Sequence, residues 1–111
     1  MMAGLVFLPD GREWNASSSV FYWALDALAQ RAEHPGLVRG LREVADNNLG
    51  ALDLEVMPAD QLAELTGLAQ RLPEVGRTEL PDTSARDEIV SQLAELAELL
   101  AHSGPGAAGP G

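Results

Sequence analysis

The two histidines are the residues whose side chains could most directly perform acid–base or metal chemistry. His34 and His102 each fall near the end of a predicted helix, without the i, i+4 pairing of a zinc-binding helix. The chain contains no cysteine, so thiolate ligands and thiol nucleophiles are excluded. Because the dipole at a helix C-terminus stabilises a cation, both histidines are interpreted as helix-end residues. We therefore expect no metal and no cofactor.

Serine and carboxylate side chains offer two further kinds of catalysis. A serine among residues 17–19, or Ser84, could join a histidine and an aspartate, but the sequence has no nucleophile elbow and no glycine-rich oxyanion loop. Asp53 and Glu55 would share one face of an extended segment, as glycosidic or metal chemistry requires, although such pairs arise by chance in an acidic chain. The sequence predicts that the protein is not an enzyme. The enzymatic alternative predicts a pocket in which His34 or His102 lies beside a carboxylate.

The charge is strongly acidic and unevenly distributed. Seventeen Asp and Glu face seven basic residues, all of them Arg, for a net charge of −10 among 111 residues. Residues 1–50 hold six acids and four Arg, whereas residues 51–111 hold eleven acids and three Arg. Such a field repels nucleic acid and anionic lipid and attracts basic proteins. The lack of Lys beside abundant Ala, Leu and Arg is typical of a GC-rich bacterial genome.

The aromatic triplet Phe21-Tyr22-Trp23 cannot lie on one face of a helix, because successive residues are turned by ~100°. If Phe21 joins the apolar stripe, Trp23 lies almost opposite to it. Either the N-terminal hairpin with Trp14 covers Trp23, or Trp23 and Tyr22 anchor a protein interface, as these residue types often do.

The elements that must position these residues are mostly helical. The dipeptide Asp10-Gly11 between apolar segments predicts an N-terminal β-hairpin. Apolar residues at helical spacing predict four amphipathic helices, over about 20–33, 37–49, 58–72 and 84–103, with a polar connector at 73–83. Residues 51–57 alternate apolar and acidic side chains, which is the period of a strand.

These patterns predict a mainly α fold with a Leu-rich core and a small hairpin, or an α+β fold if residues 51–57 pair as a strand. Residues 1–103 are expected to form one globular domain and the Gly/Pro-rich residues 104–111 a flexible tail. The first residues lack the basic start of a signal peptide, and no apolar run reaches the ~20 residues of a membrane span. The expected location is cytoplasmic.

The preferred functional hypothesis is a non-enzymatic acidic protein of the inhibitor, immunity or accessory-subunit type, which engages a basic partner protein. On the last helix three carboxylates lie opposite the stripe of Ile89, Leu93, Leu96 and Leu100. An alternative is a homo-oligomer that associates through residues 89–100 or through Trp23; salt would strengthen association of an acidic face and weaken binding to a basic partner. The predicted partner-binding residues are Tyr22, Trp23, Asp87, Glu95 and Glu98.

Overall fold

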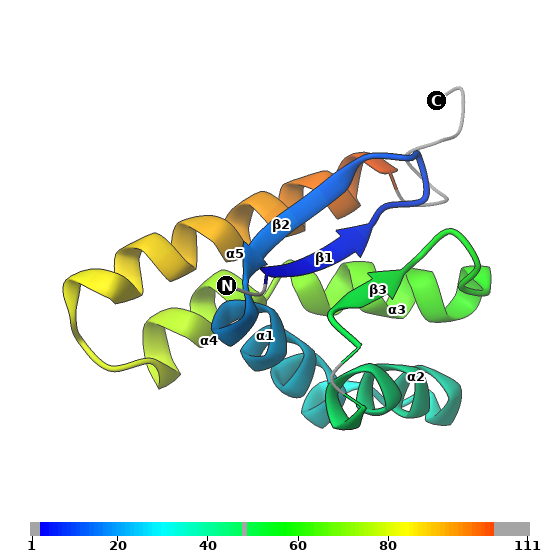
Figure 1. Ribbon diagram of the computed structural model, residues 1–111, viewed down its shortest axis with the longest axis horizontal. Helices are drawn as coiled ribbons and strands as arrows, with labels where there is room; N and C mark the ends of the chain where they lie inside the picture. Colours follow the sequence, from blue (N-terminus) through cyan, green and yellow to red (C-terminus); the bar gives the residue numbers. More distant parts are fainter. Residues whose placement is uncertain (1–2, 48, 104–111) are drawn as a thin grey trace.

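The computed structural model describes residues 3–47 and 49–103, which form five helices and three short strands (Figure 1). In chain order these elements are β1 (Ala3–Phe7), β2 (Glu13–Ser17), α1 (Ser18–Arg31), α2 (Pro35–Asp46), β3 (Ala51–Asp53), α3 (Ala59–Ala69), α4 (Leu72–Glu79) and α5 (Ser84–Ser103).

The three strands form one sheet in the order β2-β1-β3. β1 and β2 make the predicted antiparallel hairpin, whose turn contains Gly11 at a φ of 91°. β3 returns parallel to β1, with Val6 opposite both Trp14 and Leu52. Of the segment 51–57, for which a strand was predicted, only Ala51–Asp53 pairs with β1, so the fold is mainly α with a small three-stranded sheet.

The two faces of the sheet differ in burial. Val6, Trp14, Ala16 and Leu52 point to one face and are buried, each at most 7% exposed. The helices pack on that face, and in Figure 1 the sheet lies in front of α3 and α5. The alternate positions of the same strands, which include Glu13 and Asn15, point to the other face and are exposed or half-buried. Among the described elements, no helix covers this second face.

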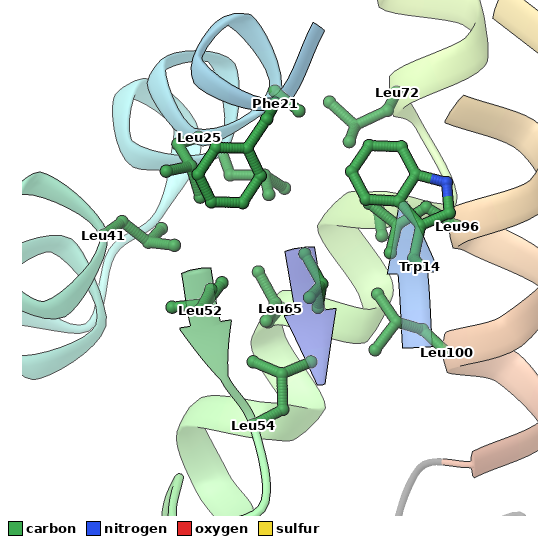
Figure 2. Packing of buried hydrophobic residues seen from close by; sticks show 14 of the residues in the cluster. Trp14, Phe21, Leu25, Leu41, Leu52, Leu54, Leu65, Leu72, Leu96 and Leu100 are labelled. Carbon is green, nitrogen blue, oxygen red and sulfur yellow. The ribbon is translucent and has the colours of Figure 1, made fainter. Parts of the chain in front are cut away.

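The hydrophobic core lies between the sheet and the helices and draws side chains from every element (Figure 2). Trp14 is 1% exposed, and its indole Nε1 donates to the backbone oxygen of Gln92 on α5 at 2.9 Å. Leu93, Leu96 and Leu100 of α5 are buried in the same cluster. The mainly α fold with a Leu-rich core and an N-terminal hairpin is thus confirmed.

The number of helices is five rather than four, because residues 72–79 form α4 where a polar connector was predicted. The third helix does not continue to residue 72 as predicted, because α3 ends at Ala69 and Pro73 occupies the first turn of α4. Proline is tolerated there because the N–H that it lacks has no partner inside the helix. α4 buries Leu72 and Gly76 and packs on α5.

The second helix begins and ends earlier than predicted, at Pro35 and Asp46 instead of about 37 and 49. The C-cap of this helix is Asn47, and Gly50 has a φ of 76° at the entry to β3. The predicted flexible tail at 104–111 lies outside the described residues. Within residues 3–47 and 49–103, no helix is long and apolar enough to cross a membrane.

Candidate functional site

The outward side of α5 carries the three predicted carboxylates. Asp87, Glu95 and Glu98 are all exposed, while the opposite stripe of the helix is buried. At ~100° and ~1.5 Å per residue, the three lie within a sector of about 80° and along about 16 Å of the helix. Glu88 is exposed at the border of the same sector. We call Asp87, Glu88, Glu95 and Glu98 the acidic face of α5.

The C-terminal half of this face borders a shallow depression of about 110 Å³. The depression is formed where the β1–β2 turn meets α5, and it is lined by Arg12, Glu95, Glu98, Leu99 and His102. The sequence analysis did not place Arg12 and His102 beside the glutamates, because the approach of the hairpin turn to α5 is a long-range contact.

Arg12 belongs to the turn more than to the acidic face. Its backbone N–H donates to Asp10 Oδ1 at 3.0 Å, and its Nε donates to Asp10 Oδ2 at 2.6 Å. The backbone hydrogen bond is the main reason why the pKa of Asp10 lies below its ordinary value, and the guanidinium adds to the effect. The guanidinium of Arg12 forms its ion pair with Asp10, and no ion pair between Arg12 and Glu95 or Glu98 occurs among the described residues.

The side chain of Tyr22 makes two contacts within the protein. Its hydroxyl oxygen accepts from the backbone N–H of Gly50 at 3.0 Å, and its ring meets that of Phe21 edge-on with centroids 4.9 Å apart. The side chain is half-buried. Tyr22 thus fixes the start of β3 against α1, and only part of its surface is open to a partner.

Trp23 is half-buried and packs against the edge of the core. Ala27 and Arg31 follow it at intervals of four on α1, and Arg31 Nη2 pairs with Glu79 Oε2 of α4 at 2.6 Å. This stripe of α1 is therefore directed towards α4. Trp14 lies against α5, and the one aromatic ring pair within the described residues is Phe21 with Tyr22, so the structure gives no ring contact between the two tryptophans.

The five predicted partner-binding residues fall into two separate groups. Tyr22 and Trp23 belong to α1, which packs on the sheet, α2, α3 and α4. The three carboxylates belong to the outward side of α5, whose inward side packs on α3, α4 and β2. The structure does not bring the aromatic pair and the carboxylates into one patch.

His34 is not a helix C-terminal cation, as the sequence analysis expected, but the N-cap of α2. Its Nδ1 accepts from the backbone N–H of Gly36 at 3.1 Å, and its Nε2 lies 3.1 Å from Asp60 Oδ2. Because Nδ1 accepts a hydrogen bond, the neutral ring carries its proton on Nε2, which faces Asp60. The carboxylate of Glu64 accepts from the backbone N–H groups of Glu33 and His34, at 2.8 and 3.1 Å. These bonds tie the α1–α2 junction to α3.

Two places match the enzymatic alternative of a histidine beside a carboxylate: His34 lies next to Asp60, and His102 lines the depression together with Glu95 and Glu98. However, both ring nitrogens of His34 are occupied, so this tautomer has no lone pair free to act as a general base. Asp53 and Glu55 do not form the predicted pair on an extended segment, because β3 ends at Asp53 and its Oδ1 accepts from the backbone N–H of Glu55 at 2.9 Å. Among the residues with described positions, no group of three His, Asp or Glu could hold a metal ion.

Comparisons with family models, curated proteins and solved structures gave no match to this chain. The functional argument therefore depends on the chain's own surfaces.

Proposed function

We propose that this protein is a non-enzymatic binding protein that engages a basic partner protein through the acidic face of α5. The observation that carries the proposal is the exposure of Asp87, Glu95 and Glu98 along one side of a helix whose other side is buried. Among the described residues, no arginine forms an ion pair with these three carboxylates. Unneutralised charge on a rigid element accelerates encounter with a partner of opposite sign.

The position of Glu95 and Glu98 supports a functional role because it is unfavourable for stability. The two residues are three apart on one helix face, where like charges repel by about 0.2–0.5 kcal/mol. Selection for stability alone would not favour this arrangement.

Two arginines form ion pairs between other helices. Arg31 pairs with Glu79 between α1 and α4, and Arg42 Nη1 pairs with Asp26 Oδ1 at 2.7 Å between α2 and α1. These cross-helix pairs use basic charge away from the outward side of α5. The carboxylates of Asp87, Glu95 and Glu98 are exposed and are available for intermolecular contacts.

A homo-oligomer is the second proposal, but the predicted 89–100 seam is not available for association. Leu93, Leu96 and Leu100 of the 89–100 seam are at most 3% exposed because they pack into the protein's own core. Association of two copies would have to use Trp23 or another surface.

The test is capture of partners from native lysate by the immobilised protein, with the captured proteins identified by mass spectrometry and their affinities then measured on purified components. Neutralising two charges with Glu95→Gln and Glu98→Gln should weaken binding of a basic partner by about tenfold at low salt. About 1 M salt, where the Debye length is ~3 Å, should abolish the difference.

The matched control is Glu43→Gln with Asp46→Asn, which removes the same charge from exposed positions of α2. If this control weakens binding as much as the α5 variant, the effect belongs to net charge, and the acidic face of α5 is not the site. A captured partner that is acidic, or whose binding strengthens with salt, would contradict the proposal.

A further inference from the structure

The uncovered face of the sheet holds an aromatic ring between two carboxylates. Phe7 lies at the end of the central strand β1 and pairs directly with Glu13 of β2 and with Asp53 of β3. Because all three positions have the same parity in the pleat, their side chains leave the same face. Adjacent strands are ~4.8 Å apart, so the ring has a carboxylate-bearing neighbour at about that spacing on either side.

The three side chains are accessible. Glu13 and Asp53 are exposed and Phe7 is half-buried. Neither carboxylate pairs with an arginine within the described parts of the chain. Arg12, next to Glu13 in the sequence, is held by Asp10 at the turn. The negative charge beside Phe7 is therefore not neutralised by a neighbouring side chain that the structure describes.

The next row of the same face is apolar. Leu5 pairs with Ala51 on one side and with Asn15 on the other, and both Leu5 and Ala51 are half-buried. Two residues along β1 separate the rows by about 7 Å. This side of the protein thus combines apolar surface with flanking negative charge.

We infer that the face formed by Leu5, Phe7, Glu13, Ala51 and Asp53 binds an arginine-bearing segment of a partner protein. A guanidinium stacks on a phenyl ring and carries five N–H donors, so one arginine can contact Phe7 and both carboxylates. An aliphatic side chain two residues away in an extended partner segment would reach Leu5 and Ala51. A second copy of this chain fits less well, because it would bring Glu13 and Asp53 of each copy into a shared apolar contact.

This inference does not depend on the acidic face of α5, because α5 packs on the opposite, buried face of the sheet through the contact of Trp14 with Gln92. The two surfaces can therefore be tested separately with charge variants of equal size.

The experiment is an NMR titration of the ¹⁵N-labelled full chain with the peptide acetyl-Arg-Gly-Leu-amide. A second peptide has citrulline in place of arginine, which keeps the shape of the side chain and removes its charge. We expect saturable shifts of backbone amides in β1, β2 and β3 with the arginine peptide, and about tenfold weaker binding of the citrulline peptide. Glu13→Gln with Asp53→Asn should weaken the arginine peptide similarly, and Phe7→Thr should remove the preference for arginine.

The control is again Glu43→Gln with Asp46→Asn, which should leave the titration unchanged. Thermal melts of each variant show whether it is folded before its titration is interpreted. The inference is overturned if the peptide does not bind, if arginine and citrulline peptides bind equally, or if the sheet shifts depend on protein concentration alone, as self-association would produce. Shifts confined to α5 would also overturn it while agreeing with the proposed function.

Discussion

Gly4→Ala tests how α1 is seated on the sheet. A Cβ added at Gly4 would lie 2.1 Å from Phe21 Cγ and 2.2 Å from Phe21 Cβ. Phe21 is 0% exposed, so its ring cannot turn into solvent, and its Cβ is fixed to the backbone of α1. The helix itself must therefore move away from β1 to accommodate the methyl group.

The expected cost follows from that contact. Over-packing of a core costs about 1–3 kcal/mol, and the upper part of this range applies because backbone must shift. The loss of glycine flexibility in the unfolded chain returns about 0.4–1 kcal/mol. We expect Gly4→Ala to lower the free energy of unfolding by about 2 kcal/mol and Tm by about 10 °C.

The matched control is Gly67→Ala in α3, where nothing lies within 4 Å of the added Cβ. There, alanine should stabilise the helix by about 1 kcal/mol. Both variants are compared by urea unfolding followed by circular dichroism. If Gly4→Ala is as stable as the parent protein, or if both variants shift stability in the same direction, the close approach of α1 to β1 is not as described.

Three further outcomes test single interactions. Trp14→Phe removes an indole N–H that donates to α5 and leaves a gap in the core, so it should lower the free energy of unfolding by about 2 kcal/mol in urea titrations. His34→Ala should lower it by about 1 kcal/mol, whereas His34→Asn, which can still accept from Gly36, should recover most of that loss. The pKa of Asp10 is lowered in the folded state, so the ionised carboxylate and its contact with Arg12 stabilise the fold at pH values above the ordinary pKa of an aspartate. This stabilisation is lost as the pH falls through the lowered pKa. Asp10→Asn should therefore reduce the dependence of Tm on pH in acid.

Elements with strong local signals could be predicted from the sequence. Asp10-Gly11 specifies a tight turn, and the hydroxyl of Ser17 accepts from the backbone N–H of Val20 as the N-cap of α1. The apolar stripe of the last helix also predicted α5, which begins at Ser84 as expected. In each case the residues that determine the element lie within a few positions of one another.

Two errors have a common physical origin in proline. Proline is unfavourable in the interior of a helix but is well suited to its first turn. Pro35 and Pro73 are therefore compatible either with the end of one helix or with the start of the next. Pro73 was interpreted as a break, whereas it lies in the first turn of α4. At Pro35 it did not anticipate a cap by His34, which depends on the tautomer and orientation of the ring.

The candidate surfaces differ in how far they could be predicted. The carboxylates of α5 follow from the helical period of one segment, and the structure leaves them exposed as expected. The row of Glu13, Phe7 and Asp53 depends on the register of three strands, one of which is parallel and comes from a segment some forty residues away. Alternation predicts that residues 51–57 are extended, but it does not identify the strand with which they pair.

Stability and binding are expected to respond in opposite directions to changes at the acidic face of α5. Since Glu95 and Glu98 repel each other on one face of α5, Glu95→Gln with Glu98→Gln should raise Tm slightly at low salt while it weakens partner binding. Replacement of a residue that serves only to stabilise the fold would lower Tm together with partner binding. A decrease in Tm of this variant, in a melt compared with that of Glu43→Gln with Asp46→Asn, would mean that the two glutamates stabilise the fold, and the argument that their placement reflects binding would then be lost.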